Sequence, residues 1–246
     1  YEIGSGLVGS EMCIRDRSGG ISMAQKALNL EDIVAGNIIQ TKGIGSMTWL
    51  KDGERYSRLE NNKQTGGTDI VAYRAKDNSR EVIIPSSLLT DKSTGRPIPV
   101  RSVSWSADNE KVLIYNNTRR VWRYDTRGDY WVLNLKDGAL RQLGKGMPES
   151  SMMFAKFSPD GTRVAYVSNN NIYVEDIDSG KITQLTKDGS DTIVNGTFDW
   201  VYEEEFSCRD GFRWSPDGKH IAYWQSDTKG TGAVSYTHLR AHETGA

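Results

Sequence analysis

Short runs of apolar and β-branched residues, each followed by a polar turn, recur along most of the chain. Four of the turns share an aromatic residue followed by small or polar residues that include an aspartate; they lie at 49–53, 105–109, 157–161 and 214–218. Their spacing is about 55 residues, and strand-sized segments separate them. The segments that predict strands are 69–74, 81–84, 111–115, 130–135, 140–143, 163–168, 171–177, 182–186 and 219–225.

A unit of about four short antiparallel strands at a fixed period is typical of a β-propeller blade. The sequence therefore predicts an all-β fold, a partial β-propeller of about four blades whose last blade is truncated. A β-sandwich is the alternative all-β fold, but it does not explain the recurring aromatic turn. Helix is predicted in one place only, a short segment near 200–206.

Composition narrows the class of protein further. The chain has 246 residues, a hydrophobic content of 37% and a net charge of −1. It contains no run of eighteen apolar residues, so we expect no membrane span. The balanced charge gives no basis for a nucleic-acid partner. Two cysteines and three histidines without zinc-like spacing predict neither a disulfide framework nor a metal or cofactor site.

The two ends do not resemble folded protein. Residues 1–17 and 234–246 show no helical or strand periodicity and resemble translated sequencing-adapter sequence. We therefore expect Cys13, His238 and His242 to be non-native. Residues 18–24 resemble the end of a secretory signal, which predicts a periplasmic or secreted protein, although a frayed terminus explains them equally well. The predicted propeller then spans 25–233.

The segment 199–206 holds three consecutive carboxylates, Glu203, Glu204 and Glu205, after an aromatic-rich run. Adjacent carboxylates repel one another unless a cation lies between them. Such a triplet is either a solvated acidic face or a binding site for a cation, and on its own the solvated face is the commoner case.

Two stretches carry a resemblance to a known family. The sequence DWVYEEE at 199–205 resembles the motif of the dipeptidyl peptidase IV family, and VWR at 121–123, followed by Tyr130, resembles the Trp-Arg stretch of an earlier blade in the same family. The resemblance covers roughly 24–229. It implies a serine exopeptidase that removes N-terminal dipeptides, with Pro or Ala preferred second. It also implies an eight-bladed N-terminal propeller that caps an α/β-hydrolase domain.

The same resemblance implies roles for three residues. Glu204 and Glu205 match the pair that binds the substrate α-ammonium group, and Arg123 matches the arginine that contacts the peptide carbonyl. No binding role carries over to Glu203. The chemistry agrees, because an α-ammonium group has a pKa near 8 and offers three donors to carboxylate acceptors. An exposed strand cation, near Asp125 or Asp129, is the alternative interpretation of Arg123.

The chain contains no Gly-x-Ser-x-Gly sequence, so we predict no catalytic residue in it and no activity for it alone. In this interpretation the chain holds the substrate amine and gates access. Its partners are then peptides with a free N-terminus and its own missing hydrolase domain, and family resemblance adds the option of a homodimer. Two alternatives stay open: a non-enzymatic, TolB-like periplasmic binding propeller, and a relative that releases tripeptides.

Overall fold

A computed structural model of the chain describes residues 30 and 45–231. The segments 1–17, 18–24 and 234–246, to which the sequence assigns adapter-like and signal-like character, lie outside the described residues.

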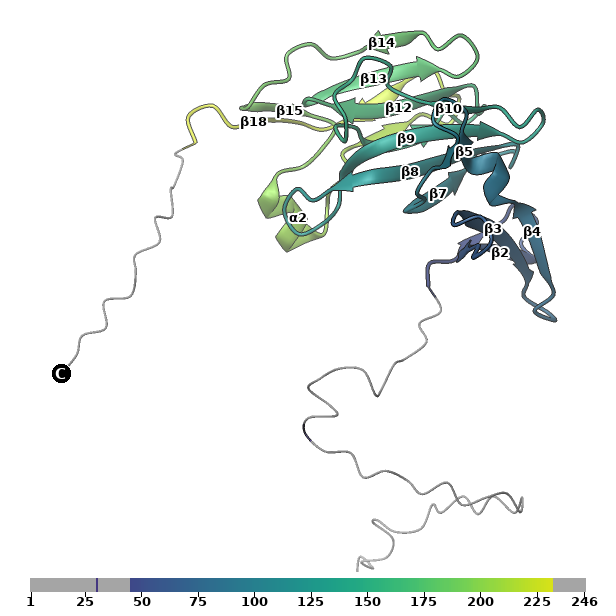
Figure 1. Ribbon diagram of the computed structural model, residues 1–246. Helices are drawn as coiled ribbons and strands as arrows, with labels where there is room; N and C mark the ends of the chain where they lie inside the picture. The colour runs from purple at the N-terminus through teal and green to yellow at the C-terminus, as the bar shows by residue number, and fades with distance from the viewer. Residues whose placement is uncertain (1–29, 31–44, 232–246) are drawn as a thin grey trace, which may run out of the picture. The chain divides into compact units, whose positions relative to one another are not determined.

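Three four-stranded antiparallel sheets make up most of the described chain (Figure 1). The first contains β1 (Thr48–Trp49), β2 (Arg55–Asn61), β3 (Thr68–Arg74) and β4 (Arg80–Ile84). The second contains β7 (Ser102–Trp105), β8 (Lys111–Arg119), β9 (Arg127–Asn134) and β10 (Leu140–Gln142). The third contains β11 (Met153–Phe157), β12 (Arg163–Ser168), β13 (Asn171–Asp176) and β14 (Ile182–Gln184). In each sheet, strands consecutive in sequence are also neighbours in space, which is the up-and-down arrangement of a propeller blade.

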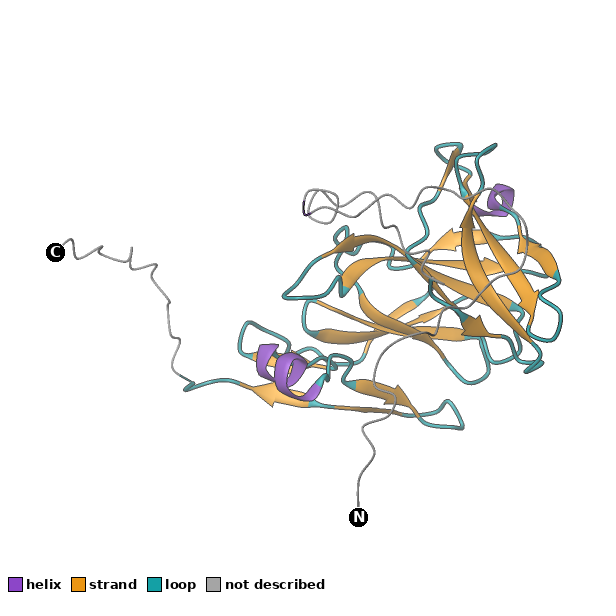
Figure 2. Ribbon diagram, turned by 90° about the horizontal axis from the view of Figure 1, so that it is seen from below, coloured by secondary structure: helices purple, strands orange, loops and turns teal. Residues whose placement is uncertain are grey.

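A fourth, smaller unit follows the third blade. It consists of two antiparallel pairs, β15 (Ile193–Asn195) with β18 (Gln225–Asp227) and β16 (Phe212–Trp214) with β17 (Ile221–Tyr223). Helix α2 (Trp200–Phe206) lies between β15 and β16 in sequence and beside the last strands in space (Figure 2). The fold is thus a partial β-propeller, and the helix lies where the sequence predicts it.

The connection between the first and second blades contains structure that the sequence does not predict. It holds a short 3-10 helix, η1 (Ser86–Leu89), and a small hairpin of β5 (Thr90–Asp91) and β6 (Arg96–Pro97). These elements are two to four residues long, which is too short for a periodic pattern.

The recurring turn has one construction in three of the units. In the third blade the Ser158 hydroxyl donates to Asp160 Oδ1 at 2.5 Å, and the same carboxylate oxygen accepts from the Thr162 amide. Gly161 follows at φ +67°, a conformation that favours glycine. The Ser158 hydroxyl is the main cause that lowers the pKa of Asp160 to about 2.

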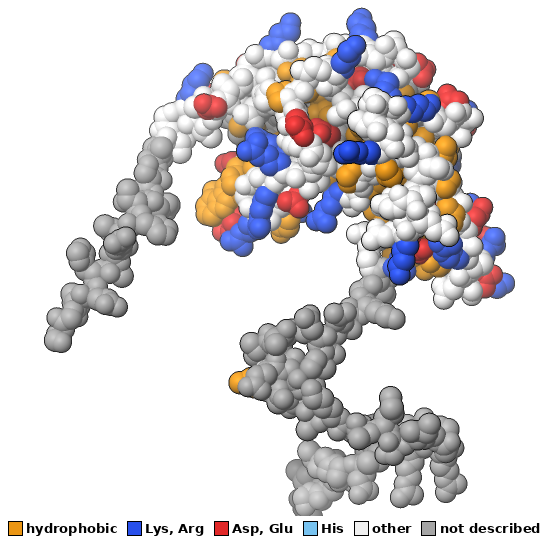
Figure 3. Space-filling view, viewed as in Figure 1, with side chains coloured by type: hydrophobic (Ala, Val, Ile, Leu, Met, Phe, Trp, Pro, Cys, Tyr) orange, Lys and Arg blue, Asp and Glu red, His pale blue; other side chains and the backbone are white. Residues whose placement is uncertain are grey.

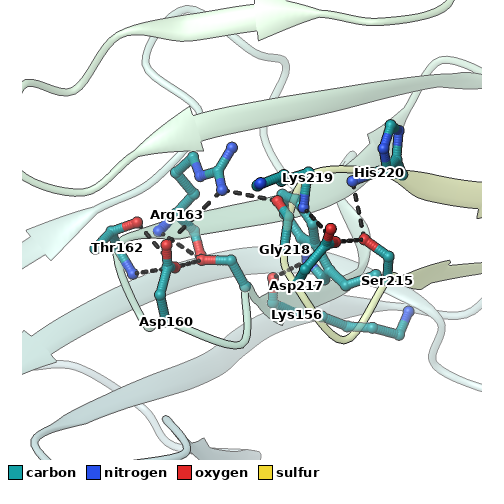
Figure 4. A network of polar contacts seen from close by, with 11 residues as sticks. Lys156, Asp160, Thr162, Arg163, Ser215, Asp217, Gly218, Lys219 and His220 are labelled. Carbon is teal, nitrogen blue, oxygen red and sulfur yellow. Dashed lines mark hydrogen bonds and ion pairs between the residues drawn. The ribbon is translucent and has the colours of Figure 1, made fainter.

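The turns also touch one another. Ser215 and Asp217 repeat the contact in the fourth unit, and the Arg163 guanidinium donates to the Gly218 carbonyl at 2.8 Å (Figure 4). Arg163 also lies over the Trp214 ring, with its guanidinium carbon 5.2 Å from the centroid. The repeat therefore forms three of the turns in the same way, and Arg163 joins the turn of the third blade to that of the fourth unit.

Both faces of the central strands are buried. Val112 and Ile114 of β8 pack in one cluster with the first blade, whereas Leu113 points to the opposite face and packs with the third blade. In β12, Ala165 and Val167 pack toward the fourth unit. The hydrophobic core thus lies in layers between successive blades, which explains why these strands are apolar throughout instead of alternating.

One buried carboxylate joins two blades. Glu175 of β13 is completely buried and forms an ion pair of 2.5 Å with Arg141 of β10. Its second oxygen accepts from the Gly144 amide at 2.8 Å. Because both carboxylate oxygens have partners, the charge is compensated inside the protein.

Among the described residues no helix is long and apolar enough to cross a bilayer.

Candidate functional site

The chain leaves the fourth unit after β15 and returns to it at β16. The segment between them, residues 198–210, is called the α2 excursion below. Its two ends are held together by an antiparallel bridge between Thr197 and Asp210 and by a hydrogen bond from the Phe198 amide to the Arg209 carbonyl. The excursion is therefore a closed loop on a narrow stem.

Local sequence explains why helix α2 forms in this excursion. The Asp199 side chain caps the helix by accepting a hydrogen bond from the Tyr202 amide at 3.1 Å. Ser207 ends the helix in the left-handed conformation, at φ +53°. The rings of Phe198 and Tyr202 stack at 5.1 Å across the first turn, which resembles a hydrophobic staple.

A second loop, residues 120–126 between β8 and β9, approaches this helix. Within the loop the Val121 amide donates to the Tyr124 carbonyl, and the Tyr115 hydroxyl donates to the Asp125 carbonyl at 2.8 Å. The loop exposes Trp122 and Tyr124 to solvent. Its backbone is thus held by β8 while its side chains remain accessible.

Three contacts join the loop to the α2 excursion. Arg123 Nε forms an ion pair with Glu204 Oε1, and the Arg123 amide donates to Glu203 Oε1 at 3.3 Å. The guanidinium group of Arg209 lies over the Tyr124 ring, 4.1 Å from its centroid. Segments some eighty residues apart in sequence therefore form one site.

The three consecutive glutamates have different surroundings. Glu203 is buried, with 4% of its surface exposed, and holds the loop backbone. The Glu204 side chain is 14% exposed, and its Oε1 accepts from both Arg123 and the Trp200 indole, the latter at 2.8 Å. Glu205 is exposed, and no described residue forms an ion pair or hydrogen bond with its side chain. On the two less buried glutamates, Glu204 Oε2 and the Glu205 carboxylate therefore have no partner among the described residues and can accept hydrogen bonds from a ligand.

Arg123 is also only partly engaged. Its Nε is directed to Glu204, whereas its side chain is 66% exposed and its terminal amino groups have no partner among the described residues. A guanidinium group can donate from several nitrogens at once. The site therefore presents two carboxylate acceptors next to free guanidinium donors, which suits a ligand that carries a cationic amine close to a carbonyl oxygen.

Apolar side chains surround these charges. Trp200, Val201, Tyr202 and Phe206 are each between 43% and 65% exposed, and Figure 3 shows hydrophobic side chains gathered over the part of the surface that Figure 1 labels α2. Because these side chains are exposed, they exclude water from the carboxylates only when a ligand covers them, and this exclusion strengthens the attraction between a bound ion and the carboxylates.

The structure brings Arg123 and Glu204 into direct contact. Glu205 follows Glu204 in the same helix and is exposed, and no described residue contacts its carboxylate. Glu203, for which the sequence assigns no binding role, is the residue that contacts the Arg123 backbone. Its burial depends on which face of a seven-residue helix meets the loop, and the sequence contains no signal for that. Among the described residues, no group of three or more His, Cys, Asp and Glu side chains is arranged to hold a metal ion.

Residues 106–245 match the protein family described as the dipeptidyl peptidase IV (DPP IV) N-terminal region. The chain belongs to this family. It is similar to a probable dipeptidyl-aminopeptidase B of Aspergillus terreus, with 28% identity over 222 residues, which is 86% of this chain and 24% of the relative. A protein of the same description from Podospora anserina is 39% identical over 132 residues, 53% of this chain and 14% of the relative.

A solved structure shares the fold of this dipeptidyl peptidase IV N-terminal region. The crystal structure of Porphyromonas gingivalis dipeptidyl peptidase 4 aligns with a TM-score of 0.67 and 26% identity, covering 82% of this chain and 28% of that chain. The matches thus cover between 14% and 28% of the length of the relatives named here.

Proposed function

We propose that this chain is part of the propeller of a serine-type dipeptidyl peptidase and that the α2 excursion binds the α-ammonium group of a peptide substrate. The observation that carries the proposal is the arrangement at Glu204. One of its oxygens is occupied by Arg123 and Trp200, no described residue contacts the other, and the next residue of the helix, Glu205, is exposed. The names of the similar proteins, dipeptidyl-aminopeptidase and dipeptidyl peptidase, support the same activity.

The chemistry of the ligand fits these atoms. An α-ammonium group has three donors, and Glu204 Oε2 and the Glu205 carboxylate can accept two of them. The free amino groups of Arg123 can then donate to the first peptide carbonyl in a charge-assisted hydrogen bond. Because the carboxylates hold the amine at a fixed place, the number of residues that fit before the scissile bond is limited, and this limit would select dipeptides.

The remaining parts of the proposal concern the whole protein. The serine nucleophile, its hydrolase domain and the preference for Pro or Ala belong to parts of the parent protein outside this chain. The chain itself would hold the substrate amine and gate access without hydrolysing it. The signal-like residues 18–24 favour a periplasmic or secreted location for the parent.

Blocking the substrate amine tests this proposal. In the full-length protein, kcat/KM is measured for a dipeptidyl chromogenic substrate with a free amine and for the same substrate N-acetylated. Acetylation removes the charge and adds bulk, so we expect a loss of at least about thirtyfold, since unpairing a desolvated charge costs about 2–5 kcal/mol. Equal turnover of the two substrates would exclude amine recognition.

A further inference from the structure

Lys156 contacts Asp210 of the α2 excursion and is not part of the site formed by Arg123 and the glutamates of α2. Lys156 lies on β11, where a register shift between Met153 and Lys156 interrupts the pairing with β12. Phe154, inside this bulge, has φ +55°, a left-handed conformation that is unusual for a bulky residue. Bulges redirect side chains, and this one accompanies a lysine whose side chain is only 25% exposed.

The Lys156 ammonium group has a complete set of partners. Nζ donates to Asp210 Oδ1 at 2.5 Å and to the Phe154 carbonyl at 3.1 Å, and it lies 3.6 Å from the centroid of the Phe212 ring. Arg213 is the other cation that contacts Asp210, at 2.9 Å. The ammonium group is therefore held between a carboxylate, a carbonyl and an aromatic face.

Asp210 belongs to the α2 excursion, so its contact with Lys156 joins the excursion to the third blade. It is the last residue of the α2 excursion and bridges to Thr197, the residue just before the excursion begins. Lys156 thus connects the third blade to the stem, whereas Arg123 connects the second blade to the helix at the far end. In sequence, Glu205 lies between these two attachments, because Arg123 contacts Glu203 and Glu204 and Lys156 contacts Asp210.

We propose that Lys156 is a positioning residue that fixes the stem of the α2 excursion to the third blade through Asp210 and thereby sets where Glu204 and Glu205 lie. The inference rests on the proposed function only in naming what is positioned. The attachment itself is a claim about the structure, and it can be tested separately.

A residue that holds the α2 excursion in place affects local opening of the excursion, whereas a generally stabilising residue affects unfolding of the whole chain. Removing one partner of a buried ion pair is costly when the remaining charge is left unpaired, but Asp210 keeps its contact with Arg213 when Lys156 is replaced, so the effect on global stability is small. Lys156→Met, which keeps most of the side-chain volume, should therefore leave the urea unfolding midpoint of the chain close to that of the wild type. Its effect should appear instead as faster local opening of the excursion.

Hydrogen exchange of the 246-residue chain tests the attachment. In Lys156→Met the amides of residues 200–206 should exchange about tenfold faster, while those of β12 and β13 should be unchanged. Lys156→Arg, which keeps the charge, should restore most of the protection. Asp210→Asn removes the same contact from the other side, and the double variant should exchange no faster than the faster single variant.

Lys136→Met is the matched control, because Lys136 forms an ion pair of 2.7 Å with Glu110 on an exposed part of the second blade. It should leave the α2 excursion unchanged. Unaltered exchange of residues 200–206 in both Lys156→Met and Asp210→Asn would overturn the inference. Should Lys156→Met not fold, the Asp210→Asn result decides alone.

Kinetics of the full-length protein separate this inference from the proposed function. Lys156→Met should raise KM for the free-amine substrate about tenfold with little change in kcat, because it displaces a binding group and no reacting atom. If the wild type does not distinguish free from acetylated substrates, the proposed function fails while the exchange result still decides the attachment. If the wild type distinguishes them and KM is unchanged in Lys156→Met, the positioning inference fails alone.

Discussion

The repeated turns and the α2 excursion both place carboxylates against hydrogen-bond donors, but they do so over different distances along the chain. In the turn of the third blade, Asp160 accepts from a hydroxyl two residues away and from the amide of Thr162. In the excursion, Glu203 accepts from an amide 80 residues away, and Asp210 pairs with a lysine 54 residues away. The turn carboxylates are therefore engaged by neighbours in sequence, whereas the excursion depends on the assembled blades.

This difference distinguishes the repeated turns, which form the framework of the blades, from the proposed binding site on α2. Three turn carboxylates each accept a hydrogen bond of 2.5 Å from the serine two residues earlier: Asp108, Asp160 and Asp217. Each carboxylate is therefore engaged within its own turn. The glutamates of α2 occupy successive positions and have three different environments. The proposed site arises where a carboxylate oxygen has no partner among residues 45–231.

The largest effect should come from Glu204. Replacing Glu204 with Gln removes the charge that faces both Arg123 and the proposed substrate amine, so kcat/KM of the full-length protein for a free-amine dipeptidyl substrate should fall by the equivalent of about 2–5 kcal/mol. Steady-state kinetics measures this. Asp178→Asn, at an exposed hairpin turn of the third blade, is the control and should be neutral. Wild-type kcat/KM in the Glu204→Gln enzyme would show that Glu204 has no role in binding the substrate.

The variant Arg123→Lys tests whether the planar shape of the guanidinium group matters in addition to its charge. In Arg123→Lys the charge remains, but a lysine has no planar fork with which to contact Glu204 and a carbonyl together. We expect kcat/KM to fall roughly tenfold to a hundredfold, in line with about 1.5–3 kcal/mol for hydrogen bonds to charged groups. A lysine variant with wild-type kinetics would mean that Arg123 contributes only charge.

The pH dependence of stability tests the non-local contact at Lys156. Burial lowers the pKa of Lys156 from 10.5 to about 8, against the opposing effect of Asp210. Between pH 8 and 10.5 the unfolded chain therefore holds a proton that the folded chain has released, so this lysine makes the free energy of unfolding rise with pH across that window.

Urea denaturation of the wild type and of Lys156→Met at pH 7 and pH 10 measures this term. The wild type should gain about 2 kcal/mol relative to the variant as the pH is raised. A difference that stays constant, or that shrinks with rising pH, would contradict the burial of a charged lysine at this place.

The smallest effect should come from a single turn. Asp160→Asn weakens the contacts with Ser158 and Thr162, and we expect a loss of about 1 kcal/mol in the free energy of unfolding at pH 7. The pKa of Asp160 is lowered to about 2, so its contribution is present above pH 3.8 and is lost as the pH falls through 2. The wild type and the variant should thus converge in acid, which thermal melts between pH 2 and pH 7 can show.

The sequence predicts the framework well because its determinants are local. Strand β12 has the predicted bounds, 163–168, and α2 forms where the predicted helix is. Several strands were not predicted: β1, β2, β7, β11, β15 and β16. The predicted strand 219–225 is two strands, β17 and β18, which pair with different partners, and β18 pairs with β15 at least thirty positions earlier. The burial of Glu203 and the Lys156–Asp210 contact were likewise not predictable, because they depend on how separate blades meet and not on spacing along the chain.

The central claim is that Glu205 and Glu204 recognise a charged amine, and a cycle that changes carboxylate and amine together tests it most directly. In the full-length protein, kcat/KM is measured for free-amine and N-acetylated substrates with the wild type and with Glu205→Gln. If the carboxylate acts through the amine, the preference of the wild type for the free amine should fall by at least tenfold in Glu205→Gln, while turnover of the acetylated substrate stays nearly the same. An equal loss for both substrates, with the preference unchanged, would contradict the claim.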